Sequence, residues 1–140
     1  FFSEQRPKKL KAVFFGDSIT QHGFNPKISG WLCHFANWWT RRVDVINRGF
    51  SGYNSKWGVM IVDQVVLPLH PDIVFVFFGA NDAVDKSVGQ HVPLNDYASN
   101  IRTIITKLRQ VLNVNVSRVN LPQVVNAQSM YVLVLRVFQK

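Results

Sequence analysis

Apolar strand patterns alternate with amphipathic helical patterns through residues 10–110, and this order constrains the fold more than any other feature. The strand patterns are short, mainly apolar runs at 10–15 and 43–46 and a run of six apolar residues at 73–78. The helical patterns repeat apolar residues every three or four positions at 29–42, 55–67 and 96–110. Strands that alternate with helices predict a parallel sheet with right-handed crossovers, and continuously apolar strands predict helices on both of its faces. We therefore expect an α/β fold.

The helical segments also predict which side chains face the sheet. Ser29 is the expected N-cap of the first segment, and Pro68 is expected to end the second. The expected inward residues are, in chain order, Trp31, Leu32, Phe35, Trp38 and Trp39; Trp57, Met60, Ile61 and Val65; and Tyr97, Ile101, Ile104, Ile105 and Leu108.

The alternation ends after Gln110. Val111–Val116 and Tyr131–Phe138 have strand-like compositions, but no helical pattern separates them. We expect residues 1–140 to form a single domain with an atypical tail at 111–140, truncated on its C-terminal side. If neither segment pairs with the third strand, the apolar outer edge of that strand is exposed and promotes aggregation.

Charge and cysteine content exclude several classes of protein. The net charge is +8, but it is concentrated near the two ends of the chain, so we expect no nucleic-acid groove and no nucleic-acid partner. No apolar run approaches the roughly 18 residues that span a membrane. Cys33 is the only cysteine, which favours a reducing, cytoplasmic location and a role as a small core side chain.

Polar loops that contain glycine follow each of the three predicted strands. They are 16–20, 47–54 and 79–83. Because open parallel sheets bind ligands beyond the carboxyl ends of their strands, the three loops predict one common site. They supply the Ser18 hydroxyl, the backbone N–H groups of Ser18 and Gly52, and the side-chain amide of Asn81. A hydroxyl nucleophile and preorganised donors for an oxyanion are the groups that acyl transfer requires.

Four sequence blocks in this order carry a resemblance to a known family. They are GDSITQHGF at 16–24, RGFSGYN at 48–54, FFGANDA at 77–83 and QHVPLNDY at 90–97. Residues 10–110 resemble the GDSL/SGNH hydrolases, most closely their isoamyl acetate-hydrolysing esterase branch. The resemblance implies a flavodoxin-like, three-layer α/β/α fold with the second, first and third strands adjacent. It also implies Ser18 as the nucleophile, an oxyanion hole of Ser18, Gly52 and Asn81, small carboxylic esters as substrates, an acyl-enzyme intermediate, and neither a metal nor a cofactor.

The chain departs from this family in the block that supplies the catalytic base. The family carries an Asp-x-x-His block near its C-terminus, whereas no aspartate of this chain has a histidine three residues later. For His22 a polar loop or solvent-facing role is favoured over that of a base, and for His91 a binding or surface role. His34 is expected on the polar side of the first helix, and His70 in a proline-rich turn.

Two classes of function therefore stay open. The first is a serine esterase that lacks its catalytic Asp and His, and the alternative is an inactive module that binds a small ester or carbohydrate. A flavodoxin-like phosphate or nucleotide binder ranks last because the chain has no glycine-rich phosphate loop.

Three charged residues near the predicted site have structural interpretations of their own. Asp17 is expected to fix its loop by accepting backbone N–H groups rather than to transfer protons. Asp82 is expected to brace the loop of Asn81. For Arg48, contact with substrate and pairing with a carboxylate are equally compatible with the sequence.

Overall fold

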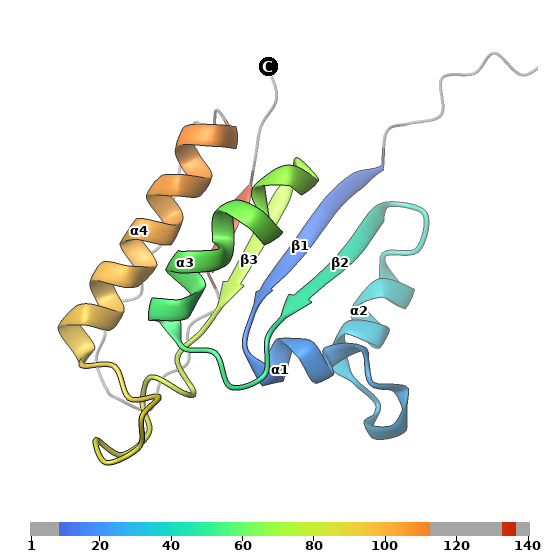
Figure 1. The fold of residues 1–140 in the computed structure, drawn as a ribbon. Helices are drawn as coiled ribbons and strands as arrows, with labels where there is room; N and C mark the ends of the chain where they lie inside the picture. The colour runs from blue at the N-terminus through green and yellow to red at the C-terminus, as the bar shows by residue number, and fades with distance from the viewer. Residues whose placement is uncertain (1–8, 113–132, 137–140) are drawn as a thin grey trace, which may run out of the picture.

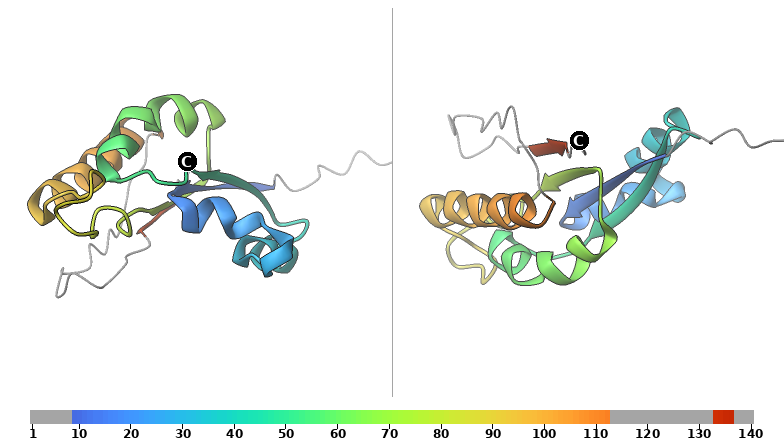
Figure 2. Two further views of the ribbon diagram at one scale, coloured as in Figure 1. Left: turned by 60° about the horizontal axis from the view of Figure 1, so that its bottom comes forward. Right: turned by 90° about the horizontal axis from the view of Figure 1, so that it is seen from above.

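The computed structural model describes residues 9–112 and 133–136. In this part of the chain, a sheet with the strand order β2-β1-β3-β4 carries helices on both faces (Figures 1 and 2). The strands are β1 (Leu10–Gly16), β2 (Val43–Gly49), β3 (Ile73–Phe77) and β4 (Leu133–Arg136). The α-helices are α1 (Ser18–Gln21), α2 (Trp31–Trp38), α3 (Ser55–Val65) and α4 (Leu94–Leu112), and the 3₁₀ turns are η1 (His22–Phe24), η2 (Pro26–Ile28) and η3 (Leu67–Leu69).

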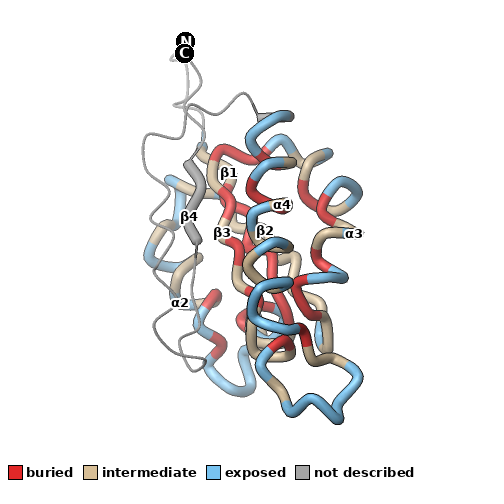
Figure 3. Tube along the Cα trace, turned by 90° about the vertical axis from the view of Figure 1, so that its left-hand side faces the viewer, coloured by how far each residue is buried: buried red, intermediate tan, exposed pale blue. Residues whose placement is uncertain are grey.

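The sheet is the middle of three layers. Helices α3 and α4 lie on one face, and α1 and α2 lie on the other (Figure 2). Successive side chains of β1 point to opposite faces of the sheet, and because helices cover both faces, β1 is buried on both sides. Much of β1 is buried (Figure 3). Val13 and Phe15 join the core beneath α3 and α4, whereas Ala12 and Phe14 join a smaller cluster beneath α2. The three-layer α/β/α prediction is confirmed.

The strand order confirms that the second, first and third strands are adjacent. Strand β1 pairs in parallel with β2 on one side and with β3 on the other. Strand β4 pairs with the outer edge of β3 but runs antiparallel to it, so the expectation of parallel strands does not extend to this segment. Of the tail pattern at 131–138, residues 133–136 form this strand, and the remaining four residues lie outside the described part.

Helix α2 is shorter than the pattern at 29–42 predicts. Ser29 is not its N-cap, because this residue has a left-handed φ of 51° and ends the preceding turn η2. Asn25 caps that turn by accepting the backbone N–H of Lys27 at 3.0 Å. The N-cap of α2 is Gly30. A local turn signal at Asn25 and Pro26 therefore overrides the apolar period at this end of the helix.

The inward face of α2 is built on Leu32 and Phe35. Leu32 is fully buried, and the Phe35 ring packs edge-on against Phe14 and Phe75 at centroid distances of 5.0 and 5.9 Å. The prediction for Trp38 is wrong, since this side chain is 81% exposed. It is the last residue of the helix and lies off the face that Leu32 and Phe35 turn to the sheet.

Helix α3 buries a different face from the one predicted. Ile61 and Val65 pack against the core as expected, but Trp57 and Met60 are 36% and 65% exposed. The innermost residues are Gly58 and Val62.

Close approach of α3 to the sheet explains this shift. A Cβ atom on Gly58 would lie 3.0 Å from the Phe78 ring. Helix α3 therefore packs against the sheet at Gly58, where it has no side chain. A prediction that counts only large apolar residues misses this face of the helix.

Helix α4 confirms its predicted inward face. Ile104, Ile105 and Leu108 are buried, Ile101 packs against them, and the Tyr97 hydroxyl donates to the Phe78 carbonyl at 3.0 Å. The helix continues to Leu112, so the strand expected at 111–116 is wrong for its first two residues, and 113–116 lie outside the described part. None of the helices in the described ranges is both long and apolar enough to cross a membrane.

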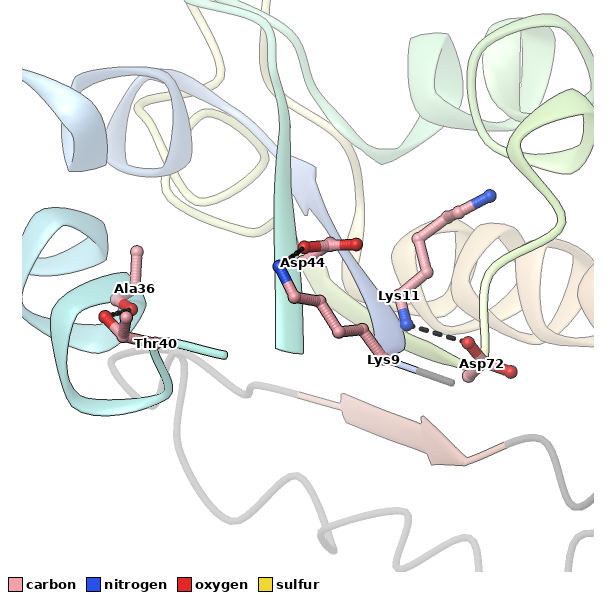
Figure 4. Close-up of polar contacts among 6 residues, drawn as sticks. All are labelled: Lys9, Lys11, Ala36, Thr40, Asp44 and Asp72. Carbon is pink, nitrogen blue, oxygen red and sulfur yellow. Dashed lines mark hydrogen bonds and ion pairs between the residues drawn. The ribbon is translucent and has the colours of Figure 1, made fainter. Parts of the chain in front are cut away.

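Polar contacts fix the end of the sheet opposite the predicted site (Figure 4). The backbone N–H of Lys11 donates to the Asp72 carboxylate at 2.7 Å, and the backbone N–H of Asp72 donates back to the Lys11 carbonyl at 2.9 Å. The ammonium of Lys9 lies 3.1 Å from the Asp44 carboxylate. These contacts hold the starts of β1, β2 and β3 in register.

Candidate active site

Hydrogen bonds join the loops after β1 and β2 at the carboxyl edge of the sheet. The N–H of Phe50 donates to the Gly16 carbonyl at 2.8 Å. The N–H of Ser51 donates to the Gln21 side-chain carbonyl at 2.7 Å, and Asn47 donates to the Thr20 carbonyl at the same distance. The second loop is thus fastened to α1, the helix that carries Ser18.

Ser18 is the first residue of α1, directly after β1. Asp17 caps this helix by accepting the N–H of Ile19 at 2.9 Å, and its carbonyl accepts the N–H of Gln21 at 2.9 Å. The prediction that Asp17 fixes its loop is confirmed. At a helix N-terminus the first N–H groups have no intrahelical partner, so the Ser18 N–H is available to a ligand.

Gly52 is placed in the second loop with a φ of 82°. Residues with a Cβ atom rarely adopt this left-handed backbone, which explains why glycine occupies the position. The Gly52 carbonyl is not open to a ligand, since it accepts the Gln90 side-chain amide at 2.9 Å.

Asn81 reaches the second loop from the end of β3. Its side-chain nitrogen donates to the Tyr53 carbonyl at 2.7 Å. A primary amide carries two N–H groups. One of them orients the side chain, and the other has no hydrogen-bond partner among the described residues.

Asp82 connects the third loop to the start of α3. It accepts the Ser55 N–H at 3.0 and 3.1 Å and the Ser55 hydroxyl at 2.5 Å, and the hydroxyl in turn accepts the Asn100 amide at 3.0 Å. Ser55 and Asp82 are buried, with Asp82 only 3% exposed, and Asn100 is half-buried. The prediction that Asp82 braces the loop of Asn81 is confirmed, and Asp82 does so by binding Ser55 at the start of α3.

Two buried carboxyl groups lie under the loops. Burial raises the pKa of Asp17 above its ordinary value, and the nearby Asp82 raises it further, against the lowering effect of the Ile19 N–H. Burial also raises the pKa of Asp82, against the lowering effect of the Ser55 hydroxyl and N–H.

The raised pKa of Asp82 predicts a pH dependence of stability. Because the folded chain binds this proton more tightly than the unfolded chain, the contribution of Asp82 to the free energy of unfolding falls as pH rises from about 4 through the raised pKa. Above that pKa the contribution is constant. Urea unfolding across this range is expected to show the wild type losing stability relative to Asp82→Asn as pH rises. Parallel profiles of the two proteins would contradict this assignment.

Among the described residues, none of the four histidines forms a hydrogen bond with the Ser18 hydroxyl. The side chains of His22 and His34 are exposed, as predicted. His70 has a left-handed φ of 46° at the end of η3, which lies before β3 and away from the carboxyl edge. The Nδ1 atom of His91 donates to the Val84 carbonyl at 2.7 Å.

Arg48 faces the far end of α3. Its guanidinium donates to the carbonyls of Val65 at 3.2 Å and Asn47 at 2.9 Å. The interpretation that Arg48 pairs with a carboxylate is therefore wrong among the described residues, because its guanidinium binds backbone carbonyls instead. Within those same residues, no group of three or more histidine, cysteine, aspartate or glutamate side chains is arranged to hold a metal ion.

Comparison with known proteins decides the family. The profile of the GDSL-like Lipase/Acylhydrolase family matches residues 14–133. The chain belongs to this family. It is 41% identical over 107 residues to the isoamyl acetate-hydrolyzing esterase 1 homolog of Rattus norvegicus, covering 72% of this chain and 42% of the rat protein. A GDSL esterase/lipase of Arabidopsis thaliana is 40% identical over 111 residues, covering 72% of this chain and 45% of the plant protein.

Solved structures place this GDSL-like chain among esterases of the same fold. The crystal structure of an acetyl xylan esterase superposes with a TM-score of 0.66 at 27% identity, covering 72% of this chain and 53% of the esterase. The resemblance seen in the four sequence blocks is confirmed. The chain spans a little under half the length of the curated relatives that it matches.

The sequence patterns missed several polar residues of this GDSL-like site. Gln90 and Asn54 were not singled out, although both hydrogen-bond between the second and third loops. A cap signal could have found Asn54, because an asparagine directly before a helical period is a typical N-cap. Gln90 has no such local signal, since its partner Gly52 lies 38 residues away.

Proposed function

We propose that this chain carries the nucleophile and the oxyanion hole of a serine ester hydrolase that acts on small carboxylic esters. The observation that carries the proposal is the meeting of three loops beside Ser18. The Ser18 N–H, the Gly52 N–H and the second N–H of Asn81 come from loops that hydrogen bonds fasten together. Preorganised donors of this kind stabilise the negative charge that develops on a carbonyl oxygen under attack.

The proposed reaction proceeds through an acyl-enzyme. The Ser18 Oγ atom bonds to the ester carbonyl carbon, and its proton passes to a base. The three donors bind the resulting oxyanion, the carbon–oxygen bond to the alcohol breaks, and the alcohol leaves with a proton. Water then attacks the acyl group, releases the carboxylic acid and returns the proton to Ser18.

The relatives support acetyl esters as the substrate class. The rat relative is named for the hydrolysis of isoamyl acetate, and the structural neighbour is an acetyl xylan esterase. Both names describe the removal of an acetyl group from an alcohol oxygen. We therefore propose small acetyl esters for this chain.

Acetylation of Ser18 is the direct test. After incubation with 4-nitrophenyl acetate and imidazole as an external base, mass spectrometry of tryptic peptides is expected to locate one acetyl group on Ser18. Ser51 lies exposed in the neighbouring loop and is the internal comparison, because both serines meet the same reagent. A chain that binds the ester and is never acetylated would support the inactive module instead, and acetylation confined to other residues would refute Ser18 as the nucleophile.

We also propose that the protein works in the cytoplasm and without a nucleic-acid partner. The single cysteine, Cys33, is half-buried on α2 and unpaired, which suits a reducing compartment. Subcellular fractionation with an antibody to the chain tests the location, and recovery in an oxidising compartment would contradict it.

A further inference from the structure

Four consecutive residues, Gly52 to Ser55, are held by residues 81–90, the segment that follows β3. The Gly52 carbonyl accepts the Gln90 side-chain amide at 2.9 Å, and the Tyr53 carbonyl accepts the Asn81 amide at 2.7 Å. The Asn54 amide donates to the Gln90 carbonyl at 2.9 Å. Ser55 completes the series through its bonds to Asp82. The two loops therefore form one hydrogen-bonded unit beside Ser18.

The segment that presents Gln90 is closed on itself. Its ends meet where the Val92 N–H donates to the Asp82 carbonyl at 3.1 Å. Inside it, the His91 ring donates to the Val84 carbonyl at 2.7 Å, and the His91 N–H donates to the Val88 carbonyl at 3.0 Å. Gln90 therefore extends from a braced loop toward Gly52.

Gly52 needs such a restraint from outside. Glycine has more backbone freedom than any other residue, and an oxyanion donor is effective only when it is fixed before the reaction. A Cβ atom built on Gly52 would find a single heavy atom within 4 Å outside its chain neighbours, the side-chain nitrogen of Gln90 at 3.3 Å. Outside its chain neighbours, the side chain that lies against Gly52 is thus that of Gln90.

We propose that Gln90 is a positioning residue: by holding the Gly52 carbonyl it fixes the peptide unit that follows Gly52, limits rotation of the Gly52 backbone, and so aims the Gly52 N–H as an oxyanion donor. This inference rests on the proposed esterase function. The Gln90 side chain holds the Gly52 carbonyl and takes no part in bond making. The side-chain amide of Gln90 is suited to the role because it donates to the Gly52 carbonyl. The backbone carbonyl of Gln90 is itself held by the Asn54 amide. Asn54 also caps α3 by accepting the Trp57 N–H at 3.1 Å.

Gln90→Met tests the inference, because methionine keeps the length of the side chain and removes the donor. We expect imidazole-dependent acetylation of Ser18 by 4-nitrophenyl acetate to slow about tenfold, since loss of a whole oxyanion donor costs about 10²–10³. The melting temperature is expected to change little. Gln64→Met is the matched control, because Gln64 is exposed on α3, and it is expected to match the wild type.

Gln90→Glu adds a pH readout. At neutral pH its carboxylate faces the Gly52 carbonyl and donates no hydrogen bond, so the rate is expected to fall as in Gln90→Met. When the carboxyl is protonated it regains a donor, and the Gly52 amide signal in NMR spectra is expected to return toward that of the wild type as pH falls toward 4. A merely structural role predicts no such recovery.

The Gly52 amide signal in NMR spectra separates this inference from the proposed function. The wild type is expected to give one sharp signal, which broadens or splits in Gln90→Met and stays unchanged in Gln64→Met. An unchanged Gly52 signal together with wild-type acetylation in Gln90→Met would overturn the positioning role. If the wild type is never acetylated, the esterase function fails, and the Gly52 signal still decides whether Gln90 fixes this peptide.

Discussion

Ser18→Ala is expected to reduce the imidazole-dependent hydrolysis of 4-nitrophenyl acetate to the background that imidazole itself produces. The external base is essential to this prediction. In serine hydrolases, loss of the nucleophile alone costs about as much as loss of nucleophile and base together, because the two act as a unit. No described histidine forms a hydrogen bond with the Ser18 hydroxyl, so without imidazole we expect only a small difference between the wild type and Ser18→Ala.

Added imidazole replaces the missing partner in part. A positioned general base contributes about 10²–10⁴, and a diffusing one recovers only a fraction of this, so we expect the wild-type rate to rise about tenfold above that of Ser18→Ala. Release of 4-nitrophenolate at increasing imidazole measures the effect, and Ser18→Ala supplies the background from imidazole itself.

Ser51→Ala is the matched control for this experiment. It removes one exposed serine hydroxyl from the adjacent loop and leaves the Ser51 N–H bond to Gln21 in place. Its imidazole response is expected to equal that of the wild type. Equal responses in the wild type and Ser18→Ala would show that the nucleophile lies elsewhere.

The sequence predicted the sheet because each central strand has a mainly apolar run. Strands β1 and β3 match their predicted runs to within one residue, whereas β2 continues from the predicted 43–46 to Gly49 and takes in the first three residues of its predicted loop. Loops after parallel strands emerge at one edge, which is why the loops of Ser18, Gly52 and Asn81 could be grouped in advance.

The errors arose where packing or a local turn outweighs the apolar period. Gly58 contributes nothing to a count of large apolar residues, yet it marks the innermost face of α3. Ser29 has the residue type of an N-cap, but the turn begun at Asn25 places it in a left-handed conformation. The contact of Gln90 with Gly52 depends on the path of two loops, and no periodicity encodes it.

Gly49→Ala is expected to cause the largest loss of stability among single substitutions near the site. A Cβ atom on Gly49 would lie 2.0 Å from the backbone nitrogen of Gln21 and 2.6 Å from the carbonyl carbon of Thr20. These are backbone atoms of α1, which the Asn47 side chain already holds against the end of β2 at 2.7 Å from the Thr20 carbonyl. The helix would have to move away as a unit, and such overpacking costs about 3 kcal/mol of unfolding free energy.

Gly89→Ala is the matched control, because a Cβ atom there meets nothing within 4 Å. Its free energy of unfolding is expected to stay within about 0.5 kcal/mol of the wild type. Since α1 begins at Ser18, any movement of α1 also displaces the nucleophile from Gly52 and Asn81. Gly49→Ala is therefore expected to lose imidazole-dependent acetylation even under conditions where circular dichroism shows it folded. Urea unfolding of both variants measures the stability difference, and a Gly49→Ala chain as stable as Gly89→Ala would show that α1 does not rest on the end of β2.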